Sequence, residues 1–225
     1  MMFSLEKMLE ITGDVQWADH LERVAYNALP TQITDDFSGR QYYQQTNQIA
    51  CSREWRNFVT QHEDNDNVFG VLNGYPCCTC NMHQGWPKFA MSTFMKSDDG
   101  IVSAAIAPAK LTTVINGVNV TVESETLYPF GSSVNYIVTA DGECDFTLSL
   151  RIPACAASAK VDGEDAEPGT IVTLKRVWNG TSVVKLLKDV TETSTCKFPY
   201  SHTMDLNGFT WKTEGAGNAI WILAA

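Results

Sequence analysis

The spacing of the apolar residues changes from helical to alternating near residue 99, and this change most constrains the fold. Before it, apolar residues recur every three or four positions, as on one face of an amphipathic helix. After it, they alternate with polar residues, as in strands that bury one face. Helices first and strands second predict an α+β fold with segregated parts. We expect two domains, residues 1–97 and residues 98–225.

Residues 1–29 predict a helical hairpin. Two runs of helical spacing are separated by Gly13, and Asp14 is placed to cap the second helix. Pro30 ends the second run, because proline cannot continue a helix. Antiparallel helix pairs of this kind build helical barrels as well as bundles.

The second part of the chain predicts short antiparallel strands joined by tight turns. The main apolar runs are 118–122, 134–139, 146–152, 171–174 and 183–187. The expected turns between strands are Asn116-Gly117, Asp141-Gly142, Asp162-Gly163 and Asn179-Gly180. Strands of this length and spacing are typical of a β-sandwich.

The composition excludes several classes of function. A net charge of -10 disfavours binding to the phosphate backbone of nucleic acids, whereas a neutral ligand such as a sugar meets no such penalty. A run of about 18 apolar residues, which a membrane span needs, does not occur. Hydrophobic residues make up 44% of the chain, which favours a folded protein.

Three of the seven cysteines and one of the four histidines lie within residues 77–83. Cys77, Cys78, Cys80 and His83 carry groups that bind zinc-like metals, and a thiolate is also a strong nucleophile. Adjacent cysteines are unusual in structural zinc sites, which favour Cys-x-x-Cys pairs. The residues alone leave open a local four-ligand metal site and, alternatively, small thiols buried at a helix start.

A helix over residues 81–95 is predicted to follow the cysteines, with a kink or a late start at Pro87. The cysteines would then lie at a helix N-terminus, where the helix dipole lowers the pKa of a thiol. Trp86 falls on the apolar face of this helix. We expect Trp86 to pack in the core or, alternatively, to contact a bound sugar.

The segment before the cysteines, residues 31–76, has no clear periodicity and is rich in amides and aromatics near residues 40–48. Long irregular segments in compact domains are often functional loops. Gln45 and Asn47 are therefore candidates for hydrogen bonds to a sugar. The alternative is a loop rich in turn formers, and the acids around His62 are expected to be solvated.

Several motifs together resemble one known family. They are Cys77-Cys78-x-x-Asn81 and its continuation to Phe89, the helix pair 9–14 and 21–27, Tyr128-Pro129-Phe130, and Leu150-Arg151-Ile152-Pro153. This combination resembles glycoside hydrolase family 127, formerly domain of unknown function 1680.

The resemblance implies the C-terminal helices of an (α/α)6 barrel followed by an antiparallel β-sandwich. It implies retaining hydrolysis of terminal β-L-arabinofuranosides or related sugars at a zinc site. Cys77 would be the nucleophile and a zinc ligand, and Cys78 a second ligand. Family members carry a further glutamate and cysteine ligand, and the acid/base glutamate, upstream of the segment that matches Met1. We therefore expect this chain to need the preceding barrel segment in cis and to be inactive alone.

Two alternatives remain beside the enzyme. The chain could be a non-catalytic remnant whose sandwich supports or binds carbohydrate. It could also be a thiol-based redox or metal sensor, in which the paired cysteines act without a glycoside substrate. The residues do not indicate a compartment, although an exported or periplasmic location would suit a protein that degrades glycans.

Overall fold

The computed structural model describes residues 1–44, 50–53, 62, 65–189, 203–206 and 209–212. Contacts divide the chain into two compact units, one of Met1–Glu22 with Lys88–Thr195 and one of Arg23–Pro87 with Cys196–Ala225. The fold is mixed α+β, as expected from the change of hydrophobic period. The expected domain boundary between residues 97 and 98 stays a prediction. No helix of the described residues is long and apolar enough to cross a membrane.

The predicted helical hairpin is present as α1 (Met2–Thr12) and α2 (Val15–Arg23). Gly13 ends α1 in the left-handed conformation, with φ 66°, and its N–H donates to the Leu9 carbonyl at 2.8 Å. The Asp14 carboxylate accepts from the Gln16 N–H at 3.0 Å, which caps the start of α2. A π-helical turn at Val24–Ala28 and a 3-10 turn at Pro30–Gln32 follow α2.

The helical run around the cysteines is earlier and more broken than predicted. It consists of α3 (Cys77–Asn81), a 3-10 turn (Met82–Gln84) and α4 (Gly85–Met91). The predicted helix end at residue 95 is wrong, because Phe94 belongs to strand β1. Pro87 lies in the first turn of α4, where its missing N–H costs no intrahelical hydrogen bond. A new helix at Gly85 is therefore how the chain accommodates this proline.

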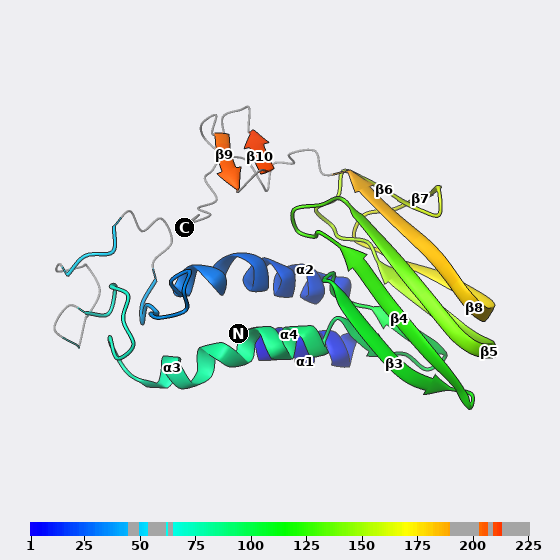
Figure 1. The fold of residues 1–225 in the computed structure, drawn as a ribbon, viewed down its shortest axis with the longest axis horizontal. Coiled ribbons are helices and arrows are strands. Elements are labelled where there is room, and N and C mark those ends of the chain that lie inside the picture. The colour runs from blue at the N-terminus through cyan, green and yellow to red at the C-terminus, as the bar shows by residue number, and fades with distance from the viewer. Residues whose placement is uncertain (45–49, 54–61, 63–64, 190–202, 207–208, 213–225) are drawn as a thin grey trace. The chain divides into compact units, whose positions relative to one another are not determined.

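Eight strands form one sheet. Its strands β3 to β8 are labelled in Figure 1. They are β1 (Phe94–Lys96), β2 (Gly100–Ser103), β3 (Ala109–Ile115), β4 (Val118–Thr126), β5 (Ser133–Arg151), β6 (Ser158–Val161), β7 (Glu164–Ala166) and β8 (Ile171–Asp189). The strand order is β1-β2-β5-β8-β6-β7, with β4 paired to β5 and β3 paired to β4. All pairs are antiparallel except β2 with β5. A separate hairpin joins β9 (Thr203–Leu206) to β10 (Phe209–Lys212).

Strands β5 and β8 are the long strands in Figure 1, and they pair along most of their length. Their register shifts between Ala140 and Cys144, opposite Gly180, which has φ 63°. Before the shift β5 pairs with β4, and after it β5 pairs with β2, so the sheet curls at this point.

Two of the four predicted turns are therefore wrong. Asp141-Gly142 lies at the bulge inside β5, and Asn179-Gly180 lies opposite it inside β8. The other two predictions are confirmed. Asn116-Gly117 and Asp162-Gly163 have positive φ at both residues and join β3 to β4 and β6 to β7, as type I′ hairpins require.

The curled sheet encloses the main core. Its fully buried members come mostly from alternating positions of three strands: Val120, Val122, Val134, Tyr136, Val138, Leu148, Leu150, Val184 and Leu186. Trp178 stacks on Phe146 with ring centroids 5.4 Å apart, and its indole N–H donates to the Phe146 carbonyl at 3.0 Å. The hydroxyl of Tyr136 is satisfied by that of Ser103 at 2.9 Å.

A buried ion-pair network joins α2 to the sheet within the same compact unit. The Arg151 side chain is only 1% exposed, pairs with Asp19 at 2.5 Å and with Glu22, and donates from Nε to the Ala104 carbonyl at 2.7 Å. Glu22 also accepts from the Tyr128 hydroxyl at 2.7 Å. Burial and the neighbouring Glu22 raise the pKa of Tyr128, which keeps it a hydrogen-bond donor. We call Asp19, Glu22, Tyr128 and Arg151 the Arg151 network.

Candidate functional site

The candidate site is the adjacent pair Cys77 and Cys78 in the single turn of α3. The two sulfur atoms lie 3.7 Å apart, with Cys77 exposed and Cys78 half-buried. The Asn81 side-chain amide donates to the Cys77 carbonyl at 2.8 Å, and the Thr79 N–H donates to the Pro76 carbonyl at 3.0 Å. These bonds close the turn that carries both thiols, and they give Asn81 of the Cys-Cys-x-x-Asn motif a structural function.

The spacing of the two sulfurs suits a shared metal ion. Tetrahedral zinc with Zn–S bonds of about 2.3 Å holds two thiolates with their sulfurs about 3.8 Å apart. The pair at 3.7 Å matches two corners of that tetrahedron. Within the described residues, however, no three His, Cys, Asp or Glu side chains are grouped to hold a metal. Cys77, Cys78, Cys80 and His83 therefore do not form the local four-ligand site considered from the sequence.

Burial raises the pKa of the Cys78 thiol, and the hydrogen bond and charge of Cys77 raise it further. The Arg40 guanidinium acts in the opposite direction but does not reverse the shift. For Cys78 the expected lowering by the helix N-terminus is thus outweighed, because a half-buried thiol beside a second sulfur resists becoming an anion. A bound metal ion would favour the thiolate, since metal binding displaces the thiol proton.

Arg40 binds the chain on both sides of the cysteine pair, and sequence reasoning missed it. Its side chain donates from Nε to the Thr79 hydroxyl at 2.9 Å, from Nη1 to the Asn73 carbonyl at 2.5 Å, and from Nη2 to the Tyr75 carbonyl at 2.8 Å. The Thr79 hydroxyl in turn donates to the Val71 carbonyl at 2.7 Å. We call these contacts of Arg40 with residues 73–79 the Arg40 clamp.

An aromatic group also lies beside the thiols. Burial raises the pKa of Tyr42, and the neighbouring Tyr43, Cys77 and Cys78 raise it further. The Tyr42 ring meets that of His62 edge-on at 5.5 Å, and His62 lies 6.4 Å from the Tyr75 ring. Tyr75 is 57% exposed. Aromatic enrichment near residues 40–48 was the available signal for Tyr42.

The expectation of a solvated loop around His62 is wrong for the described part of that loop. His62 Nδ1 lies 2.8 Å from Asp66 Oδ1, and Asp66 is fully buried. The Asp66 carbonyl accepts from the N–H groups of Tyr42 and Tyr43 at 3.1 and 2.8 Å. Asp66 therefore ties His62 to the segment that carries Tyr42, a contact that the loop's polar sequence did not predict.

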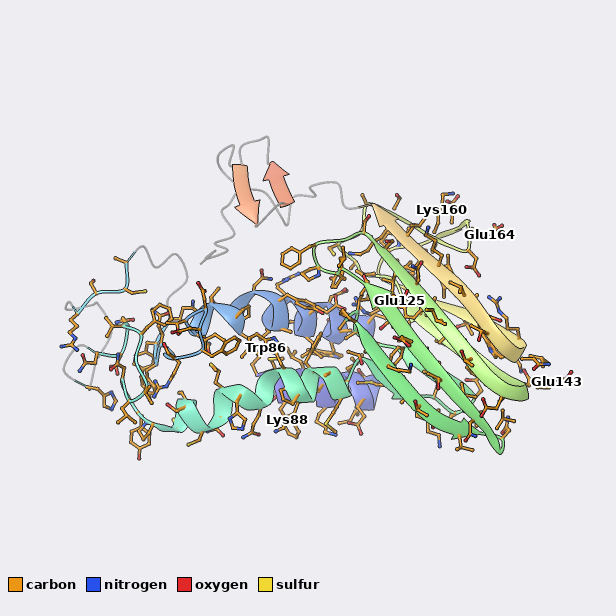
Figure 2. All side chains as sticks on the ribbon, viewed as in Figure 1. Trp86, Lys88, Glu125, Glu143, Lys160 and Glu164 are labelled. Atoms are coloured by element: carbon orange, nitrogen blue, oxygen red, sulfur yellow. The ribbon has the colours of Figure 1, made fainter. Side chains whose placement is uncertain are left out.

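The predicted sugar-binding residues have different outcomes. Gln45 and Asn47 lie outside the described residues, so their function stays a prediction. Trp86 lies on α4 (Figure 2), is half-buried, and donates from its indole N–H to the Ala25 carbonyl at 3.3 Å. Its ring also meets Phe37 edge-on at 6.1 Å. These contacts describe a packed residue, and its predicted contact with a sugar also stays a prediction.

Comparison with known proteins relates the sequence of this chain to one family. Residues 1–91 match the sequence model of the β-L-arabinofuranosidase GH127 catalytic domain, and residues 101–190 match that of the GH127 middle domain. No curated protein matches the sequence.

Solved structures share the fold at low sequence identity. A glycoside hydrolase structure has 23% identity and a TM-score of 0.66, and the match covers 84% of this chain and 31% of that structure's chain. A GH127 β-L-arabinofuranosidase from Geobacillus stearothermophilus T6 has 20% identity and a TM-score of 0.62, covering 92% and 32%. A GH127 β-arabinofuranosidase has 19% identity and a TM-score of 0.62, covering 84% and 31%.

The chain thus spans about a third of the length of these solved structures. The catalytic-domain match includes the cysteine pair and the Arg40 clamp, and the middle-domain match includes the curled sheet from β3 to β8. Between them, the two matches take in most of the sequence. This chain therefore belongs to glycoside hydrolase family 127.

Proposed function

We propose that this chain carries the downstream part of the active site of a retaining glycoside hydrolase. Its substrate would be a terminal β-L-arabinofuranoside or a related sugar, with Cys77 as the nucleophile. The observation that carries the proposal is the 3.7 Å spacing of the Cys77 and Cys78 sulfurs within the segment that matches the GH127 catalytic domain. Family membership supports the reaction class, and the spacing supports a shared metal.

Cys77 and Cys78 would hold a zinc ion, which when bound keeps both sulfurs deprotonated near neutral pH. Cys77 is the more exposed of the two and therefore the better placed to reach a sugar. Its sulfur forms a bond to the anomeric carbon as the glycosidic C–O bond breaks, and the departing oxygen takes a proton from an acid. Water then displaces the sulfur and gives its proton to the conjugate base of that acid. The sulfur returns to the thiolate, and the two successive displacements retain the anomeric configuration.

The rest of the machinery is proposed to lie in a preceding barrel segment in cis. That segment would supply the acid/base glutamate and the remaining zinc ligands, because no three His, Cys, Asp or Glu side chains of the described residues are grouped to hold a metal. Helices α1 to α4 would be the last helices of the (α/α)6 barrel, and the curled sheet would belong to the β-sandwich that follows it. By this proposal the chain alone does not turn over.

A second candidate is a non-catalytic remnant whose sheet supports or binds carbohydrate. It is favoured by the lack of a third metal ligand near the cysteines among the described residues. It predicts a protein that retains the fold, binds no stoichiometric zinc and cleaves no glycoside. The comparison of a longer form with these 225 residues separates the two candidates.

The test is hydrolysis of p-nitrophenyl β-L-arabinofuranoside by the full-length form, together with zinc analysis. We expect Cys77→Ser to lose at least about 10³-fold in rate, because an alcohol replaces the nucleophile. Cys78→Ser should lose both zinc and activity. Cys80→Ser is the matched control, since Cys80 is an exposed cysteine of the same helical turn. Equal hydrolysis before and after Cys77→Ser would refute the assignment of the nucleophile.

A further inference from the structure

Arg40 is a buried cation whose side-chain partners are all neutral. It is only 4% exposed, and the described residues contain no carboxylate paired with it. Buried arginines usually pair with a carboxylate, because an uncompensated charge is costly inside a protein. Arg40 instead donates its side-chain hydrogen bonds to residues 73–79, which indicates that its function is to hold this segment in place.

The three acceptors are distributed around the cysteine pair. The carbonyls of Asn73 and Tyr75 lie before the pair, and the hydroxyl of Thr79 lies after it. Gly74, with φ 66°, stands between the two accepting carbonyls and turns the chain there. One rigid planar guanidinium therefore ties the approach to α3 and the turn of α3 to each other.

Arg40 is itself fixed by its backbone. Its N–H donates to the Gly70 carbonyl at 3.2 Å, and its own carbonyl accepts from the Gly70 N–H at 3.1 Å. The Tyr42 ring lies 6.0 Å from the guanidinium, close enough for a cation–π contact. Gly70 thus holds the backbone of Arg40 and Tyr42 packs near its guanidinium. The clamp is therefore preorganised and is not a flexible surface contact.

We propose that Arg40 is the positioning residue of the cysteine pair, holding residues 73–79 so that the sulfurs of Cys77 and Cys78 are presented together to one ion. This inference rests on the proposed function and deepens it by naming what orients the two thiols. Arg40 acts through Asn73, Tyr75 and Thr79, and it needs no contact with the sugar. Residues that orient metal ligands without touching the metal typically lower the metal affinity about 10–100-fold when they are removed.

The guanidinium shape is what the clamp requires. Lysine would keep the positive charge but has a single nitrogen, which cannot reach three acceptors with the fork geometry of arginine. Alanine would leave all three acceptors without this donor. Thr79→Val would remove one acceptor of Arg40, together with the hydroxyl's own bond to the Val71 carbonyl, while nearly keeping the side-chain shape. A graded loss, largest for alanine and smallest for valine, is therefore the signature of positioning by hydrogen bonds.

The experiment measures Cd²⁺ binding by the full-length protein through thiolate charge-transfer absorption and competition with a chelator. We expect Arg40→Ala to weaken Cd²⁺ binding about 10- to 100-fold, with Arg40→Lys intermediate and Thr79→Val a few-fold weaker than wild type. Amide exchange should accelerate in residues 71–79 and stay unchanged in the sheet. Arg176→Ala, which removes a partly exposed arginine of β8, is the control and should leave both measurements unchanged.

An Arg40→Ala protein that binds Cd²⁺ within about two-fold of wild type, with unchanged exchange in residues 71–79, would overturn the inference. If that variant does not fold, Arg40→Lys and Thr79→Val decide by the same two measurements. Cd²⁺ binding that survives Cys77→Ser, with Arg40 and Thr79 unchanged, would also overturn it. Protein that binds Cd²⁺ through both thiols and obeys the graded series, yet cleaves neither β-L-arabinofuranosides nor related glycosides, supports the clamp while refuting the proposed hydrolase.

Discussion

Two buried arginines hold two regions of this molecule by opposite means. Arg151, in the sheet, pairs with the carboxylates of Asp19 and Glu22 and lies beside a large apolar core. Arg40, beside the cysteines, has three neutral acceptors within residues 73–79. None of residues 73–79 is a buried hydrophobic residue of the core. The sheet region is thus stabilised by burial with one charged network inside it, whereas the cysteine region depends on single polar contacts.

The difference has an energetic consequence. Removing one partner of a buried ion pair leaves an uncompensated charge and costs about 3–5 kcal/mol. Losing a hydrogen bond to a neutral buried group costs about 1–3 kcal/mol. The Arg151 network should therefore set global stability, and the Arg40 clamp should set local order around the thiols. Substitutions matched between the two regions can separate these effects.

The largest effect is expected for Arg151→Ala. It leaves the buried Glu22 and the half-buried Asp19 without their cation, so we expect the free energy of unfolding to fall by about 3–5 kcal/mol. Urea denaturation followed by circular dichroism measures this change. Arg176→Ala, in a partly exposed pair with Asp162, should change stability by less than about 1 kcal/mol. A loss for Arg151→Ala no larger than for Arg176→Ala would mean that the network does not stabilise the sheet region.

The next largest effect is the loss of stability when alanine replaces a glycine in the left-handed conformation, and each region has one such glycine. Gly117 has φ 80° with open space around it, so Gly117→Ala should cost about 1–2 kcal/mol from backbone strain alone. Gly74 has φ 66°, and an added Cβ would fall 2.3 Å from the Tyr42 ring. Gly74→Ala should therefore cost about 1–3 kcal/mol more, from overpacking. Thermal unfolding of both variants checks the order, and equal losses would show that the Gly74 loop yields without penalty.

The sequence predicted the sheet region better than the cysteine region. The helix pair, with Gly13 and Asp14 at its turn, follows from local rules that need no distant partner. So do the hairpins at Asn116-Gly117 and Asp162-Gly163. Asn179-Gly180 shows the limit of such rules, because a glycine with positive φ serves a bulge inside a strand as well as a turn. Only the partner strand, which the local sequence does not specify, distinguishes the two.

The site was predictable only where its residues are adjacent. Cys77 and Cys78 stand next to each other in the sequence, so the sequence alone predicts the pair. Arg40 lies 39 residues from Thr79, and no periodic pattern links the two. Its acceptors are mostly backbone carbonyls, which every residue possesses and which leave no trace in the sequence. The contacts of Arg40 with residues 73–79 could therefore be identified from the three-dimensional structure but not from the sequence.

The smallest effect concerns Asp36, in the same polar region as Arg40. The hydroxyls of Ser38 and Thr34 donate to its carboxylate, each at 2.7 Å, and lower its pKa from 3.8 to about 2. Because the folded-state pKa is depressed, the contribution of this turn to stability is present above about pH 4 and is lost as the pH falls toward 2. An NMR titration of the Asp36 carboxyl carbon should give a midpoint near 2 in the wild type. Ser38→Ala should move the midpoint toward 3.8, since the Ser38 hydroxyl is the largest cause of the shift. An unmoved midpoint would assign the shift to another group, and it would weaken the view that single polar contacts order this region.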